Sequence, residues 1–291
     1  EWATAARRTD PGAVLAAHGA AGVGVVVVGE PDYPAALADD PEPPVVLFHQ
    51  GPLDALDGPR VAIVGTRACT PYGREVARDL GHDLAAAGVR VVSGLALGID
   101  GAAHAGALRA GAAPVVGVVG SGHDVVYPRH HRELWARVAA EGLLLSEAPL
   151  GSVPEQWRFP SRNRVLAALA DAVVVVESRR SGGSLYTVDA ALDREVPVLA
   201  VPGPVGSPAS EGTNLLLGEG ALVCQGADDV LTLLGLSAAA ANRGRVDPRP
   251  PPAGVDQEVL DALGHRPAAL EQLAMRTGLG LADLAAALQR L

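Results

Sequence analysis

Apolar runs recur at a steady interval along the middle of the chain. Six short runs rich in β-branched residues begin about 26 to 29 residues apart, and the segments between them are helix-length and rich in Ala and Leu. This is the rhythm of βαβ units. The runs are continuous rather than alternating, as in strands that are covered on both faces. They occupy residues 61–65, 89–94, 115–120, 143–147, 172–178 and 198–203.

Two architectures share this rhythm. A TIM barrel needs eight strand–helix units, and the chain provides about six or seven. We therefore expect an α/β fold of the Rossmann-like, doubly wound type, with a mostly parallel sheet.

The segments on either side of the repeat predict three further parts. Residues 1–60, with a Val-rich strand at Val25–Val28, are expected to pack on the sheet as an N-terminal extension of the domain at 61–236. Residues 237–254 read as a proline-stiffened linker. Residues 255–291 scan as three short helices with helix-turn-helix spacing, although a generic helical bundle or a partner-binding tail fits equally well.

Composition narrows the class of protein. No apolar run approaches the roughly 20 residues that span a bilayer, no signal-peptide pattern opens the chain, and two cysteines are too few for a disulfide framework. We expect a cytoplasmic protein with no membrane contact. A net charge of -10 argues against a broad, non-specific coat of nucleic acid. All 23 basic residues are arginine, whose planar fork suits phosphate or carboxylate.

Glycine and small polar residues follow almost every predicted strand. Examples are "GTRACTPYG", "SGLALGID", "GSGHDVVYP" and "ESRRSGGSLYT". Ligands of open α/β sheets bind outside the carboxyl ends of the strands, where glycine permits close approach and helix N-termini bind anions. We call this set of loops the strand-end rim, and its composition predicts a ligand that carries phosphate.

Several other ligands are disfavoured. The first loop lacks G-x-G-x-x-G, and a chain without lysine cannot form a conventional P-loop. No His/Cys cluster has metal-ligand spacing, so we expect no metal and no cofactor. His104 is expected to be structural, the adjacent His130 and His131 to lie on the surface, and Asp100 to cap a helix.

Aromatic residues gather at the same loops. The chain has three Trp, four Tyr and two Phe, and five of these lie in or beside the strand-end rim: Tyr72, Tyr127, Trp157, Phe159 and Tyr186. Aromatics interleaved with arginines suit single-stranded nucleic acid, where stacking contributes about 1–3 kcal/mol per base. The alternative is that Tyr127 and Phe159 plug the end of the core.

The stretch "WRFPSRNRVLAAL" places Arg158, Arg162 and Arg164 at a predicted helix start. Cations there oppose the helix dipole. The placement is favourable if an anion lies between the arginines and the helix amides.

At these residues the sequence resembles the DNA-processing protein A family (DprA, also called Smf) over about residues 30–236. The resemblance implies a Rossmann-like domain that binds single-stranded DNA, forms a homodimer and helps to load RecA recombinase in natural transformation. The matching motifs are "VGTR" (64–67), "SGLALGID" (93–100), "GSGHDVVYP" (120–128), "SEAP" (146–149), "FPSRNR" (159–164), Glu177, Thr187, "PG" (202–203) and "EGTN" (211–214).

Matching by motif implies roles for individual residues. Arg67 is the arginine of the family's G-[ST]-R turn. Arg129 stands where the family commonly has a basic residue after Tyr-Pro, and residues 162–164 are the family's R-N-R. The tail resembles the family's winged-helix-like domain, here cut short. The chain departs from the family at one loop. Before Thr187 the family usually has a basic residue followed by Ser-Gly-Ser, but residues 181–184 here read Ser-Gly-Gly-Ser, and Arg179 and Arg180 lie slightly upstream.

The residues expected at a nucleic-acid interface come from the rim and these motifs. They are Gly65, Thr66, Arg67, Ser93, Gly94, Gly120, Ser121, Gly122, Tyr127, Arg129, Phe159, Arg162, Asn163, Arg164, Gly183 and Ser184.

One enzymatic alternative has a similar Rossmann variant. Lysine-decarboxylase-like phosphoribohydrolases, which cleave the base from nucleoside monophosphates, carry P-G-G-x-G-T-x-x-E and use its glutamate in the reaction. Alignment on Thr187 places Ala190 at that glutamate and Asp189 one position too early. Without the general acid/base this alternative is disfavoured, and we expect no catalysis.

Overall fold

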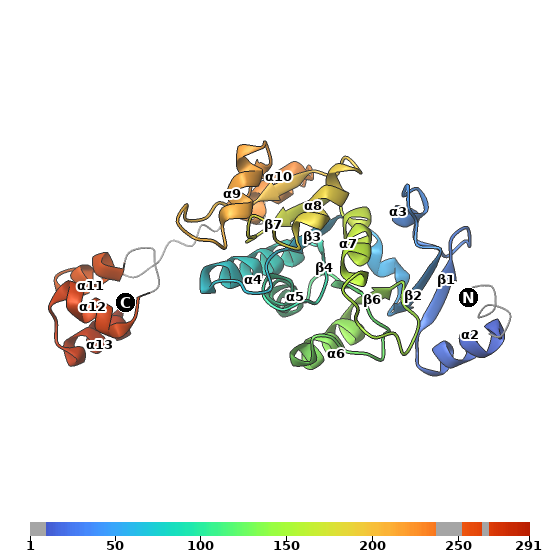
Figure 1. Cartoon of the computed structure of the whole chain (residues 1–291), viewed down its shortest axis with the longest axis horizontal. Coiled ribbons are helices and arrows are strands. Elements are labelled where there is room, and N and C mark those ends of the chain that lie inside the picture. Colours follow the sequence, from blue (N-terminus) through green and yellow to red (C-terminus); the bar gives the residue numbers. More distant parts are fainter. Residues whose placement is uncertain (1–9, 237–251, 264–267) are drawn as a thin grey trace. The chain divides into compact units, whose positions relative to one another are not determined.

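The computed structural model describes residues 10–236, 252–263 and 268–291 (Figure 1). The chain divides into two compact units, residues 1–242 and 243–291. Each unit has a hydrophobic core of its own. Of the linker expected at 237–254, residues 237–251 lie outside the described residues.

The described part of the first unit forms one nine-stranded sheet. Its order is β1-β2-β6-β5-β4-β3-β7-β8-β9, and every neighbouring pair is parallel except the two pairs that involve β2. The prediction of an open, mostly parallel sheet is confirmed, and a closed barrel is excluded. The strands are β1 (Gly24–Val27), β2 (Val46–Gln50), β3 (Arg60–Val64), β4 (Arg90–Ser93), β5 (Val116–Val119), β6 (Leu143–Ser146), β7 (Ala172–Val175), β8 (Val198–Ala200) and β9 (Leu222–Val223).

Helices cover both faces of the sheet, as in a doubly wound fold. One face packs against α4 (Pro71–Ala86), α5 (Ile99–Ala110), α6 (Arg132–Glu141) and α10 (Ala227–Leu233). The other packs against α3 (Ala35–Ala38), α7 (Arg158–Leu169) and α8 (Leu185–Leu192). The remaining helices within residues 10–236 are α2 (Pro11–Ala20), α9 (Glu211–Gly218) and the 3-10 turns η1 (Leu53–Leu56) and η2 (Arg129–His131).

The pairing of α4 with α5 depends on glycine. A Cβ at Gly106 would collide with the carbonyl of Arg78, and one at Gly81 would collide with that of Ala103. The two helices therefore approach backbone to backbone, more closely than side chains would allow. Figure 1 shows them side by side along the sheet. Because α4 follows β3 and α5 follows β4, each helix begins at the carboxyl end of its preceding strand.

Strand order reverses at β3, which pairs with β4 on one side and β7 on the other. This is a topological switch point, where connections leave a sheet in opposite directions and open a crevice. The loops after β3, β4 and β7 therefore meet at one place on the strand-end rim.

The structure differs from the sequence prediction at the N-terminal segment. One strand was expected within residues 1–60, but both β1 and β2 lie there and extend the sheet beyond β6. β2 follows a proline-rich stretch and ends in His49 and Gln50, so its apolar run is short. β9, with two exposed residues, was also missed.

The second unit consists of α11 (Val255–Leu263), α12 (Leu270–Thr277) and α13 (Leu281–Arg290). Its core is built by Val259, Leu273, Leu284 and Ala287. α12 ends at Gly278, whose φ of 69° is the left-handed conformation that closes a helix. The three helices and the glycine turn agree with the sequence prediction. No helix within the described ranges has the length and apolar character needed to cross a bilayer.

Candidate nucleic-acid interface

A cleft of about 510 Å³ opens at the switch point between β3 and β7. We call it the switch-point cleft. Its walls come from the loop after β3, the loop after β7, the first turns of α7 and the start of α8. Its lining is Val64, Gly65, Thr66, Arg67, Ala96, Asp100, Gln156, Phe159, Pro160, Arg162, Asn163, Leu166, Arg179, Gly182, Gly183, Ser184, Tyr186 and Thr187.

A smaller cavity of about 30 Å³ adjoins it on the side of the loop after β5. We call it the Tyr127 cleft. Its walls share Arg67, Ala96, Phe159 and Arg162 with the switch-point cleft. The two hollows are therefore neighbours along one rim. The Tyr127 cleft is lined by Arg67, Gly94, Ala96, Leu97, Val119, Gly120, Ser121, Tyr127, Pro128, Pro154, Phe159 and Arg162.

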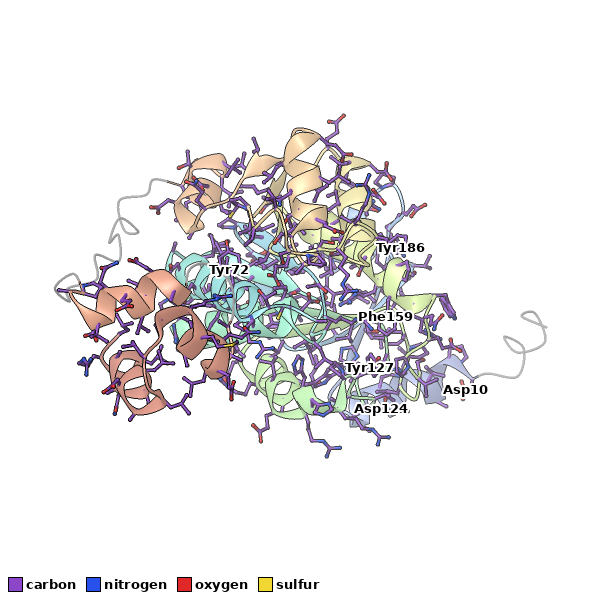
Figure 2. All side chains as sticks on the ribbon, turned by 60° about the vertical axis from the view of Figure 1, so that its left-hand side comes forward. Asp10, Tyr72, Asp124, Tyr127, Phe159 and Tyr186 are labelled. Atoms are coloured by element: carbon purple, nitrogen blue, oxygen red, sulfur yellow. The ribbon has the colours of Figure 1, made fainter. Side chains whose placement is uncertain are left out.

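Arg67 and two aromatic rings form a stack between the clefts. The Arg67 guanidinium carbon lies 4.6 Å from the centroid of the Phe159 ring, which is cation–π geometry. The Phe159 and Tyr127 centroids are 5.7 Å apart with the rings tilted by 37°. Figure 2 shows Phe159 between Tyr127 and Tyr186. Arg67 is exposed and makes no ion pair with a described residue, so its charge is available to a ligand.

Arg162 lies in the floor that both clefts share. Its side chain is buried, and Nη1 donates to the Val118 carbonyl. Nε is buried without a hydrogen-bond partner among the described residues. The guanidinium passes so close over Gly94 that a Cβ there would collide with it. Gly94, the first glycine of "SGLALGID", is therefore required for this packing.

Asp100 supplies the counter-charge to this floor. Its Oδ2 accepts a hydrogen bond from the Gly94 amide at 3.1 Å. Burial raises the pKa of Asp100, and the charge of Arg162 opposes that rise. Burial lowers the pKa of Arg162 to about 10, with Asp100 opposing, so the guanidinium stays charged at neutral pH. The prediction that Asp100 caps a helix is wrong, because Gly98 is the N-cap of α5 and Asp100 lies inside the first turn.

Hydrogen bonds hold both walls of the switch-point cleft. The buried carboxylate of Glu177, just after β7, accepts from the Thr70 amide at 2.8 Å and the Thr70 hydroxyl at 2.6 Å. Thr70 in turn caps α4 through Gly73. Across the cleft, Asn163 Nδ2 donates to the Gly183 carbonyl at 3.3 Å, which joins α7 to the loop before α8. The loops are thus fixed to each other and to the helices behind them.

The structure brings most of the predicted interface residues together. Those that line one or both clefts are Gly65, Thr66, Arg67, Gly94, Gly120, Ser121, Tyr127, Phe159, Arg162, Asn163, Gly183 and Ser184.

Four predicted residues do not line either cleft. Ser93 is buried and donates to the Ile63 carbonyl, and the Gly122 amide donates to the Ser152 carbonyl. Arg164 forms an ion pair with Glu147 and donates to the Glu42 carbonyl. Arg129 is exposed within η2. Their contact with nucleic acid stays a prediction.

Arg158, which lies outside the predicted set, stacks on Trp157 and pairs with Glu155. The histidines also have structural partners. His104 is buried, with Nε2 against the Val116 carbonyl, and burial lowers its pKa to about 4. His131 is half-buried with Nδ1 against the Leu95 carbonyl, so of the two adjacent histidines only His130 is exposed as expected.

Within residues 10–236, 252–263 and 268–291, no group of three His, Cys, Asp or Glu could hold a metal ion.

Arg179, Tyr186 and Asp100 line the switch-point cleft but were not among the predicted interface residues. The first two were visible in the sequence, as an arginine and an aromatic on either side of "SGGS". Asp100 carried no such signal, because its role depends on Arg162, which is distant in sequence.

Comparison with known proteins identifies the family to which the chain belongs. A sequence model described as DNA recombination-mediator protein A matches residues 24–235, which is most of the chain. The chain belongs to the DNA recombination-mediator protein A family. A second model, the DprA winged helix domain, matches residues 244–291 and identifies the three-helix unit.

Members of the DNA recombination-mediator protein A family resemble the chain over most of its length. Protein Smf of Synechocystis sp. is 33% identical over 297 residues, covering 90% of this chain and 74% of the relative. The X-ray structure of DprA from Streptococcus pneumoniae matches with a TM-score of 0.70 and 35% identity, covering 75% of this chain and 77% of that one. DprA from Helicobacter pylori, which binds single-stranded DNA, matches with a TM-score of 0.66 and 30% identity, covering 73% and 95%.

Proposed function

We propose that the chain binds single-stranded DNA along the strand-end rim, with little dependence on sequence and without catalysis. The observation that carries the proposal is the pair of adjoining clefts, which brings the Arg67 and Arg162 guanidiniums together with the rings of Phe159 and Tyr127. Stacked bases and backbone phosphates need these two kinds of group side by side.

Local charge supports this proposal despite the acidity of the whole chain. The switch-point cleft is lined by three arginines and a single carboxylate, Asp100, which faces Arg162 from within the floor. A groove of this sign attracts a polyanion even when the net charge is -10. The single-stranded DNA binding of the related H. pylori protein agrees with this interpretation.

The test is a fluorescence-anisotropy titration with labelled oligothymidylate, a duplex of equal length and a nucleoside monophosphate. We expect the single strand to bind much more tightly than the other two. Preference for duplex would overturn the proposal, and tight binding and hydrolysis of the monophosphate would favour the phosphoribohydrolase.

Family membership supports a proposal about the partners of this activity. We infer that the chain forms a homodimer, protects incoming single-stranded DNA and helps to load RecA recombinase on it, in the cytoplasm and during natural transformation. Sedimentation equilibrium tests the dimer, and a strand-exchange assay with RecA on strands coated by a single-strand-binding protein tests the loading. A monomer at micromolar concentration, or RecA activity unchanged by the protein, would contradict the corresponding part.

A further inference from the structure

A further hollow of about 180 Å³ lies between the first turns of α7 and the strands β2, β5 and β6. We call it the Glu147 pocket. Its lining includes neither Arg67 nor the rings of Tyr127 and Phe159, and no residue of the loop after β7. We propose that the Glu147 pocket binds a free purine nucleoside, with guanine as the preferred base. This site is separate from the proposed DNA interface.

The floor of the Glu147 pocket is apolar. Leu47 of β2, Val118 of β5 and Val165 of α7 line it and are buried in one hydrophobic cluster. Ala148, just after β6, contributes only a methyl group to the wall. A single water needs about 10–15 Å³ of such space, so the pocket has room for a much larger guest. Apolar walls favour the faces of a flat ring, with polar groups at its edge.

Three polar groups of the lining keep unused hydrogen-bonding capacity. Arg164 pairs with Oε1 of Glu147, and Oε2 has no partner among the described residues. The Ser161 hydroxyl also forms no hydrogen bond with a described residue. Arg162 is 7% exposed, and its Nε lacks a partner. Because unpaired polar groups cost free energy when they are buried, a ligand that pairs with these atoms is stabilised.

These groups also select the edge of the ligand. A carboxylate only accepts hydrogen bonds, a guanidinium only donates them, and a hydroxyl does either. Guanine has two adjacent N–H groups on one edge, which suit the Glu147 carboxylate, and acceptors elsewhere on the ring. Burial raises the pKa of Glu147, so N–H donors replace the hydration that this carboxylate has lost. Adenine and thymine each present one donor group on that edge, so both fit less well.

Trp157 marks the mouth of the pocket. It is 61% exposed, whereas the other lining residues are buried or half-buried. The Arg158 guanidinium carbon lies 4.5 Å from the centroid of the Trp157 ring, and both side chains donate to Glu155. The entrance is therefore ordered but open to solvent. A base on the floor leaves its sugar at this entrance, in contact with water.

Isothermal titration calorimetry of the full chain with guanosine, adenosine and thymidine tests the proposal. Uncharged nucleosides are used because a phosphate group is also attracted to the arginines of the two clefts. We expect guanosine to bind with a Kd of about 0.1 mM, which is ordinary for a ligand of about 20 non-hydrogen atoms. Adenosine should bind at least about fivefold more weakly, since one donor is lost, and thymidine more weakly still.

Variants with matched controls locate the site. Glu147→Gln is expected to weaken guanosine binding at least about tenfold, because a charged acceptor is lost. Its control is Glu141→Gln, which changes an ion-paired glutamate of α6 outside the pocket. Ser161→Ala should cost about threefold, and Ser152→Ala, at a half-buried serine outside the pocket, should cost nothing. Ala148→Leu fills the pocket and should remove binding. Affinity for oligothymidylate should stay within about twofold in all five variants.

The outcomes separate this site from the proposed function. If oligothymidylate binds and guanosine does not at about tenfold the expected Kd, the nucleoside site fails and the DNA interface stands. If guanosine binds with the expected dependence on Glu147 and oligothymidylate does not bind, the reverse holds. Loss of guanosine binding in Arg67→Ala, or its displacement by saturating oligothymidylate, would place the nucleoside in the DNA clefts and overturn the proposal. Equal losses for Glu147→Gln and Glu141→Gln, or equal affinity for the three nucleosides, would overturn it as well.

Discussion

At the scale of single residues, Arg162 combines two roles that usually exclude each other. It is a buried part of the floor, held by the Val118 carbonyl, and it also carries a full charge into two clefts. A buried charge requires a partner, and Asp100 supplies it. Gly94 leaves the space that this arrangement needs.

Gly94→Ala is therefore expected to destabilise the protein by about 1–3 kcal/mol, because the new methyl group forces the Arg162 guanidinium out of a packed site. Urea denaturation measures the loss. The control is Gly183→Ala in the same cleft, where a Cβ meets nothing within 4 Å, so that variant should unfold close to the unchanged protein. Equal stability of the two variants would contradict this packing.

Arg164→Ala tests a second arginine of the same motif. Burial raises the pKa of Glu147, and the charge and hydrogen bond of Arg164 oppose that rise. Without Arg164, the Glu147 carboxylate loses the charge and hydrogen bond that offset its burial. We expect a loss of about 1–3 kcal/mol, a moderate value because both side chains keep some exposure.

The pH dependence of this loss has a definite sign. A raised pKa in the folded state means that ionisation of Glu147 opposes folding, so the loss should be largest at pH 7 and shrink as pH falls toward the ordinary glutamate value of 4.5. Thermal unfolding between pH 4.5 and 7 measures it. Arg137→Ala, which breaks an exposed pair with Glu141, serves as the control and should show a smaller change. A loss that grows on acidification would refute the assignment.

The location of a residue at the strand-end rim could be predicted from the sequence where the signal is local. Arg67 and Phe159 belong to recognisable loop motifs, and both line the clefts. The fate of Arg164 depends on Glu147 and Glu42, which reach it from other elements. Spacing along the chain cannot distinguish an arginine that faces a ligand from one that faces a carboxylate on a neighbouring strand end.

At the scale of elements, β3 to β8 were predictable because a strand covered on both faces must be continuously apolar. Their order was not, because pairing of β3 with β7 joins residues more than a hundred positions apart. β2 was missed because it is the antiparallel strand of the sheet and follows prolines. The position of the switch-point cleft follows from strand order and therefore became visible only in the structure.

One ion pair ties the N-terminal segment to α8. Arg194, just after α8, contacts Asp40, just after α3, through two hydrogen bonds, and their side chains are 10% and 3% exposed. Burial raises the pKa of Asp40, but the hydrogen bonds and charge of Arg194, together with the Glu42 amide and the charge of Arg164, lower it, so the net shift is downward. This stabilisation is present above the ordinary value of 3.8 and is lost as pH falls.

Arg194→Ala is expected to cost about 3 kcal/mol of unfolding free energy at pH 7, because Asp40 is left buried and unpaired. Denaturant titration provides the measurement. The double variant Asp40→Ala/Arg194→Ala should recover part of the loss, since no isolated charge remains. Full additivity of the two single losses would show that the residues do not interact.

At the scale of the whole molecule, the chain has a net charge of -10 and yet contains a cleft lined by three arginines. We expect affinity for single-stranded DNA to fall as salt rises, with a log–log slope of about -0.7 per phosphate neutralised. Arg67→Ala should make the slope shallower by about one such step and weaken all sequences alike, because phosphate contacts carry no base information. Affinities insensitive to salt would contradict this electrostatic account.

Both clefts lie within the first unit, so binding should not require the helical unit. A chain ending at residue 236 is expected to bind oligothymidylate within a few-fold of the full chain, because the two cores of residues 10–236 are complete without the rest. Anisotropy measures affinity, and circular dichroism verifies that the shortened chain is folded. Loss of binding by a folded, shortened chain would assign part of the interface to residues 237–291.

The hydrogen bonds that tie Thr70 to Glu177 and Asn163 to Gly183 also bear on the kinetics of binding. Because the walls are already ordered, an arriving strand does not wait for a loop to close. The association rate is then set by diffusion and electrostatic steering. Differences in affinity between strands or variants arise mainly from the dissociation rate, that is, from the time that a strand stays bound. The architecture of the switch point thus favours fast capture with a residence time set by the number of nucleotides engaged.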